Sequence, residues 1–121
     1  MKRLPDGELE VMQAVWACEA PVQREEIEKV IRETHPMALT TLLTMLTRLS
    51  EKGFIRIEKN GRRSQYIPLV AQSEYRAQQS RSFIDRMFDG SMSDFAAALC
   101  ESGIPDEDLA ELQKMLEKMR K

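Results

Sequence analysis

The sequence predicts a mainly α-helical chain that carries one small β-hairpin, and three observations indicate this fold class. Apolar residues recur at helical spacing in three short segments before Gly53. The pattern then alternates over residues 54–69, around an Asn60-Gly61 pair that favours a tight hairpin turn. Helical spacing returns in the last fifty residues.

The three N-terminal segments are predicted to be short helices joined by brief connections. The first begins at Asp6, a suitable N-cap. The second covers residues 23–33 and ends before Pro36, because the residue that precedes a proline avoids helical conformation. The third covers residues 40–52, and Gly53 suits the position just after a helix end.

Two short strands are expected next, residues 54–58 and 64–69, joined by the basic turn 59–63. Three helices followed by a hairpin with a basic tip is the element order of a winged helix-turn-helix. We therefore assign residues 1–71 to a winged-helix domain.

Residues 72–121 are predicted to form amphipathic helices whose combined core is too small to be stable alone. They must pack on the first domain or on a second copy of the chain, and the regular apolar spacing with several methionines favours a dimerisation region. The residues expected at that surface are Phe83, Met87, Phe88, Phe95, Leu99, Leu109, Leu112, Met115, Leu116 and Met119.

Charge is distributed unevenly over the 121 residues, although the net charge is only −2. Residues 37–70 carry six basic and two acidic side chains, a local charge of +4, whereas residues 71–121 carry seven basic and ten acidic ones, a local charge of −3. A basic middle suits a polyanionic partner. No segment is apolar enough to span a bilayer or serve as a signal peptide, so we expect a cytoplasmic protein without membrane insertion.

The third helix separates into a core face and an outward face at about 100° per residue. Leu42, Met45, Leu46 and Leu49 form the core face. Threonine is a mediocre helix former, so the threonine-rich outward face indicates a use, and hydroxyl and methyl groups can contact phosphates and base edges. With the basic hairpin tip following the phosphate backbone, the residues expected to bind double-stranded DNA are Thr40, Thr41, Leu43, Thr44, Thr47, Arg48, Lys59, Arg62 and Arg63.

Nothing in the sequence supports catalysis, a cofactor or a metal site, so the protein is not expected to be an enzyme. His35 is the single histidine and lies at a helix boundary. Cys18 and Cys100 cannot supply a closed four-ligand zinc site, and in a reducing compartment both are interpreted as core residues.

A series of short motifs spreads over nearly the whole chain: Leu9-Glu10-Val11-Met12 with Trp16, Thr40-Thr41-Leu42-Leu43-Thr44, Arg48-Leu49, Lys52-Gly53, Arg63, Tyr66-Ile67-Pro68, Ser82-Phe83, Phe88-Asp89-Gly90-Ser91 and Glu111-Leu112. In order and spacing they resemble the penicillinase-repressor (BlaI/MecI/CopY) family of bacterial transcription regulators. The resemblance implies a homodimeric repressor with an N-terminal winged helix, a C-terminal dimerisation region and a dyad-symmetric operator, often with TACA/TGTA half-sites. It also implies a membrane-bound sensor protease that cuts the dimerisation region.

The chain departs from the family pattern at several positions. The antibiotic-resistance repressors carry basic residues where this chain has Thr40 and Leu43. Their cleaved Asn-Phe bond corresponds to Ala98-Leu99, which places any cleavage region there. The copper-responsive members carry a C-terminal cysteine cluster that Cys100 alone cannot provide, so copper sensing is not expected.

Two other functions remain open at this point. The near absence of positive charge on the outward face of the third helix favours a winged-helix protein–protein adaptor that does not bind DNA. A regulator that responds to a small molecule would need a pocket between the two regions, but no convergent polar set is evident for one.

Overall fold

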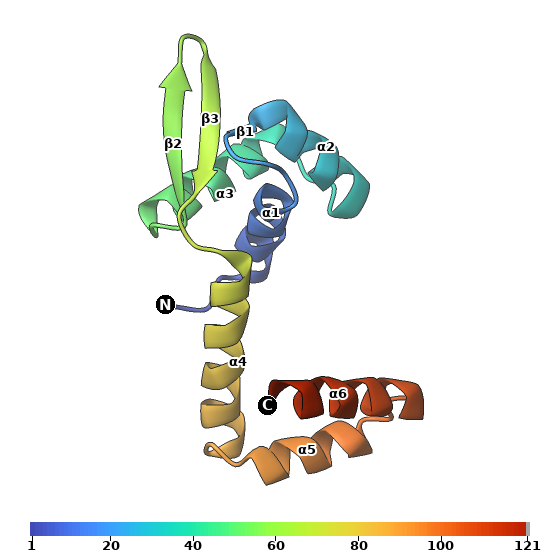
Figure 1. Cartoon of the computed structure of the whole chain (residues 1–121). Coiled ribbons are helices and arrows are strands. Elements are labelled where there is room, and N and C mark those ends of the chain that lie inside the picture. Colours follow the sequence, from blue (N-terminus) through green and yellow to red (C-terminus); the bar gives the residue numbers. More distant parts are fainter. Residues whose placement is uncertain (121) are drawn as a thin grey trace. The chain divides into compact units, whose positions relative to one another are not determined.

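A computed structural model describes residues 1–120 and confirms the predicted fold class. The chain divides into two compact units, Met1–Gln79 and the residues from Ser80 onward. Figure 1 shows the elements, which in chain order are α1 (Asp6–Trp16), β1 (Val22–Gln23), α2 (Arg24–Thr34), α3 (Leu39–Glu51), β2 (Ile55–Asn60), β3 (Arg63–Pro68), α4 (Gln72–Phe88), α5 (Met92–Glu101) and α6 (Asp106–Met119).

The first unit is built around α1, which packs against α2 and α3. Val11, Met12 and Val15 of α1 are fully buried, and so is Ile27 of α2. Three leucines of α3 complete this core: Leu42, Leu46 and Leu49. Their spacing of three and four residues puts them on one side of the helix, so burying them turns the opposite side of α3 outward.

The hairpin belongs to a three-stranded antiparallel sheet with the order β1-β3-β2. The β2–β3 pairing runs from Ile55 opposite Pro68 to Asn60 opposite Arg63, with Gly61 at positive φ in the turn. The sequence did not predict β1, because a two-residue strand has no periodicity to detect. It pairs Gln23 with Gln65 and therefore ties the start of α2 to the hairpin.

The starts of α1 and α2 differ in detail from the prediction, and α2 begins at Arg24 rather than at residue 23. Asp6 is not the N-cap of α1: the helix begins at Asp6 itself, Pro5 precedes it, and no side chain caps it. Asp6 and Glu8 instead place negative charge in the first turn, where the helix dipole favours it. At α2, Gln23 and Glu26 form a reciprocal capping box.

The first unit extends beyond the predicted boundary at residue 71, because Tyr75 of α4 is buried in it. The Tyr75 hydroxyl accepts a hydrogen bond of 2.8 Å from the backbone N–H of Leu4. Its ring lies 5.8 Å from that of Trp16 and 5.6 Å from that of Phe54, centre to centre. The Trp16 indole N–H donates to the Val70 carbonyl at 2.9 Å, so the chain entering α4 is held at two points.

The second unit contains little buried surface. Ile84 is its one buried apolar residue among those described, at 9% exposure. The rings of Phe83, Phe88 and Phe95 form two edge-to-face contacts with centres 5.8 and 5.6 Å apart. Ser91 caps α5 by accepting the backbone N–H of Asp94. Among residues 1–120, no helix combines the length and apolar character needed to cross a membrane.

We expect the fragment 1–79 to be more stable to urea than the fragment 1–71. The shorter fragment lacks the buried Tyr75 ring, and loss of a buried aromatic side chain costs about 3–5 kcal/mol of unfolding free energy. The variant Tyr75→Phe in 1–79 should fall between them, since it leaves the buried Leu4 N–H without its acceptor, at about 1–3 kcal/mol. Equal midpoints for the two fragments would place the boundary at residue 71 after all.

Candidate nucleic-acid interface

The outward face of α3 presents small side chains to solvent. Thr40, Thr41, Thr44, Thr47 and Arg48 are all exposed. The hydroxyl of Thr44 donates to the Thr40 carbonyl at 2.9 Å, and that of Thr47 donates to the Leu43 carbonyl at 3.0 Å. These two hydroxyls therefore offer acceptor oxygens, and their methyl groups remain free for apolar contacts.

Leu43 and Met45 differ from the simplest division of α3 into faces. Both are half-buried at the edge of the core, so Leu43 presents only part of its side chain outward and Met45 is not a full core residue. Leu39, which the sequence reasoning missed, is 45% exposed at the first position of α3, next to Thr40. Leu39 lines a shallow pocket with Ile31 and Leu42, so it belongs to the core side of α3 rather than to the threonine-rich face.

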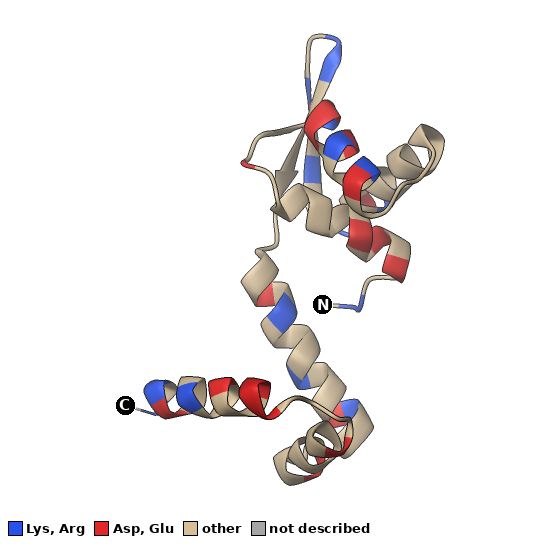
Figure 2. Cartoon of the chain, turned by 90° about the vertical axis from the view of Figure 1, so that its right-hand side faces the viewer, with Lys and Arg blue, Asp and Glu red and all other residues tan. Residues whose placement is uncertain are grey.

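The hairpin carries its positive charge at the tip, as Figure 2 shows. Lys59, Arg62 and Arg63 are exposed around the turn, and among the described residues none of them has a carboxylate within 4.0 Å. Three unneutralised cations on a protruding turn form a strong local positive potential.

Two other basic residues of the same region are engaged elsewhere. Lys52, at the end of α3, pairs with Glu8, whose side chain is 5% exposed. Arg56 on β2 pairs with Glu58 at 3.0 Å. The first pair joins α1 to the end of α3 and the second lies along one strand. The +4 charge of residues 37–70 is therefore available to a partner mainly through Arg48 and the hairpin tip.

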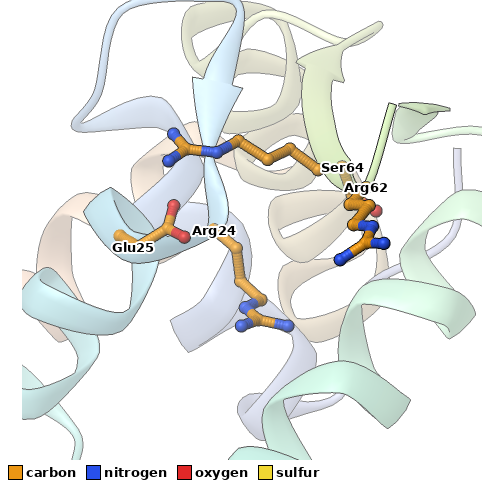
Figure 3. A pocket seen from close by; sticks show the side chains of 5 residues that line it. Arg24, Glu25, Arg62 and Ser64 are labelled. Carbon is orange, nitrogen blue, oxygen red and sulfur yellow. The ribbon is translucent and has the colours of Figure 1, made fainter. Parts of the chain in front are cut away.

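A pocket of about 80 Å³ connects the hairpin to the start of α2, and the sequence reasoning did not foresee it. Arg24, Glu25, Arg62, Arg63 and Ser64 line it, and Figure 3 shows four of these side chains labelled around it. The signal for Arg24 was hidden, because only the β1–β3 pairing brings this residue, nearly forty positions earlier in the chain, beside the hairpin.

Cys18 and Tyr66 are the two described side chains whose pKa values depart clearly from the ordinary ones. Cys18 is half-buried and Cys100 is exposed, so the expectation of two core cysteines is wrong for Cys100. Burial, with a smaller effect of Glu26, raises the pKa of the Cys18 thiol and keeps it protonated. Burial likewise raises the pKa of the Tyr66 hydroxyl, while the positive charge of Arg24 acts in the opposite direction. Over residues 1–120, no three His, Cys, Asp or Glu side chains gather as a metal site would require.

The residues predicted for dimerisation all lie in the second unit, and most are open to solvent. Phe83, Met87, Leu112, Met115, Leu116 and Met119 are 41–75% exposed. Phe88, Phe95, Leu99 and Leu109 are half-buried. The Ala98–Leu99 bond lies inside α5, with both residues half-buried, so this helix must unwind before the bond can enter a protease.

Comparison with known proteins gives consistent matches over the chain. The sequence model of the penicillinase repressor family matches residues 4–118. The penicillinase repressor of Bacillus licheniformis is 32% identical, with 97% of this chain and 94% of that protein covered. The methicillin resistance regulatory protein MecI of Mammaliicoccus sciuri is 28% identical, with 95% and 94% covered.

Two solved structures are similar to the described fold. One is the solution structure of monomeric Bacillus licheniformis BlaI in complex with the blaP half-operator, with a TM-score of 0.51 and 34% identity over 61% of this chain and 89% of that one. The other is the DNA-binding domain of the repressor BlaI, with a TM-score of 0.52 and 35% identity over 62% of this chain and 94% of that one.

Proposed function

This chain belongs to the penicillinase repressor family, and we propose on that premise that it is a sequence-specific DNA-binding transcriptional repressor. It acts as a homodimer on a dyad-symmetric operator, and it is not an enzyme. Residues 1–71, together with the first turns of α4, supply the DNA-binding domain, and the rest of residues 72–121 supplies the dimerisation region.

The observation that carries this proposal is the pairing of a low-relief helix face with a basic hairpin tip in one unit. An α-helix whose outward face consists mainly of threonines, with Arg48 as its one basic side chain, can approach the floor of the major groove closely. Lys59, Arg62 and Arg63 then reach the phosphates beside the groove. The relative with 34% identity was solved with a half-operator, which supports the same mode of binding for this chain.

The homodimer is supported by the apolar surface of the second unit. Large apolar side chains of α4 and α6 are 41–75% exposed in the single chain. An apolar surface of this kind is typical of a protein–protein contact. A second copy offers the same surface, so a twofold contact covers both at once. Such a dimer places its two α3 helices to meet half-sites about 34 Å apart, one turn of DNA.

Family membership also suggests how repression is relieved and where the protein works. The partner would be a membrane-bound sensor protease, and the chain itself works in the cytoplasm. Because Ala98 and Leu99 lie within α5, any cleavage there depends on local unwinding of that helix.

One observation favours the second candidate, a protein–protein adaptor. Arg48 is the one basic residue on the outward face of α3. A gel-shift titration with the duplex upstream of the protein's own gene, against a random duplex of equal length, decides between the two. The repressor predicts preferential binding of the upstream duplex, whereas the adaptor predicts no shift with either duplex.

Thr44→Ala should weaken operator binding by about 1 kcal/mol, or roughly fivefold in Kd, without lowering the melting temperature. Thr44 is exposed and alanine is the better helix former, so stability has no reason to fall. Thr44→Val retains the methyl group and should bind more tightly than Thr44→Ala. Thr34→Ala is the matched control, since Thr34 makes the same hydroxyl-to-carbonyl bond on α2. A lower melting temperature with unchanged binding would mean that the helix faces are reversed.

Arg62→Ala combined with Arg63→Ala should weaken operator and random duplex to the same extent. Phosphate contacts carry no sequence information, and the slope of log K against log salt should shrink by about 0.9 for each phosphate that the variant no longer binds. Arg56→Ala, in the same hairpin but paired with Glu58, is the control and should leave the slope unchanged. If the double variant keeps the wild-type slope, the hairpin tip does not touch DNA.

Leu112→Asp should produce a monomer in analytical ultracentrifugation and abolish operator binding. A carboxylate buried in the contact between two copies costs on the order of 3–5 kcal/mol of dimer stability. Gln113→Asp introduces the same charge one position along α6 and should remain dimeric. The first unit should keep its unfolding midpoint in both variants. A dimeric Leu112→Asp protein with normal binding would remove α6 from the dimer contact.

A further inference from the structure

The basic pocket between the hairpin and the start of α2 is not explained by the helix face or by the hairpin tip alone. Three arginines line it, Arg24, Arg62 and Arg63, against the one lining acid Glu25, and Glu28 pairs with Arg24 from outside the lining at 3.9 Å. Three arginines against the carboxylates of Glu25 and Glu28 leave an excess of one positive charge, which an anion can neutralise.

Backbone pairing places Arg24 beside the hairpin. β1 pairs Gln23 with Gln65, so the next residue, Arg24, is carried alongside Ser64. The capping box of Gln23 and Glu26 then fixes the first turn of α2. Arg63 precedes Ser64 in β3 and lies one residue nearer the hairpin tip. The three arginines are thus gathered by regular backbone structure.

Arg24 also has unused hydrogen-bonding capacity within the described part of the chain. Its Nε atom is buried without a hydrogen-bond partner, and the nearest carboxylate oxygen, Glu28 Oε1, lies 3.9 Å away. Its side chain is 44% exposed, so part of it remains open to a ligand. A guanidinium presents a fork of N–H donors whose geometry matches two oxygens of a phosphate.

We propose that Arg24, Arg62 and Arg63 form one shared site for a single phosphate of the DNA backbone. This inference rests on the proposed DNA-binding function and adds α2 to the interface. The site anchors the strand that passes between the hairpin and α2, so it fixes the register of α3 in the groove without reading a base. The positive end of the α2 dipole acts in the same direction, and Glu25 opposes it.

The test measures the salt dependence of full-length protein binding to the upstream duplex, by fluorescence anisotropy. Because the slope of log K against log salt counts the phosphates that are contacted, Arg24→Ala should weaken binding of the upstream duplex and shrink the slope by no more than about 0.9. Arg24→Ala with Arg62→Ala should also stay within about 0.9, because both arginines hold the same phosphate. Glu25→Gln should strengthen binding. Lys29→Ala is the matched control: it removes one positive charge from the same helix, about 140° around its axis from Arg24, and should leave the slope unchanged.

Each alternative result is decisive. Unchanged affinity of Arg24→Ala for the upstream duplex overturns the site while leaving wild-type DNA binding, and so the proposed function, intact. A double variant whose slope shrinks by about 1.8 shows two separate phosphate contacts and overturns the shared site. Failure of the wild-type protein to bind any duplex overturns the proposed function itself. Circular dichroism melting of each variant excludes unfolding as the cause.

A second measurement separates a DNA phosphate from a free one. Inorganic phosphate at millimolar concentration should shift the Arg24 Nε–H signal in 1H–15N NMR spectra of the wild-type protein, and saturating duplex should displace it. If inorganic phosphate remains bound in the presence of saturating duplex, the pocket serves a free anion, and the proposal is wrong.

Discussion

Burial of Leu42, Leu46 and Leu49 against α1 is the constraint on which the rest of the structure depends. These side chains fix the rotation of α3 about its own axis, because any other rotation would expose three leucines at a cost of about 1.5–3 kcal/mol each. The threonine face is consequently outward, and it owes its direction to residues that never meet a ligand. The Glu8–Lys52 pair also joins the end of α3 to α1. It neutralises a cation that would otherwise add to the basic surface.

Elements with a periodic apolar pattern were predictable from the sequence, whereas features that depend on single long-range contacts were not. Apolar periodicity and end signals located the start of α1 and both ends of α2 and α3 to within one residue, and Asn60-Gly61 located the hairpin. β1 escaped notice because two residues carry no period. The unit boundary moved because one buried hydroxyl, that of Tyr75, bonds a backbone group 71 positions away.

The candidate site was predictable to a similar degree and for the same reason. Helical geometry alone identified the exposed threonines, and turn chemistry identified the basic tip, whereas Arg24 could be found only after the sheet was known. The nine residues expected at the DNA remain a proposal. Eight of them are exposed, and Leu43 is half-buried. In the proposed interface, α3 offers threonine hydroxyl and methyl groups together with Arg48, while Lys59, Arg62 and Arg63 gather positive charge at the hairpin tip.

The short strand β1 has a consequence for the entropy of binding. A two-stranded hairpin is marginally stable in water, but β1 pairs with the middle of β3, at Gln65 and Tyr66, and ties this hairpin to the start of α2 before any ligand arrives. The backbone is then already ordered, and association need only immobilise long side chains, at about 0.5–1.5 kcal/mol each. The hairpin is therefore already ordered in the free protein, so binding approaches rigid-body docking. The conformational entropy of the hairpin is lost once, when the chain folds.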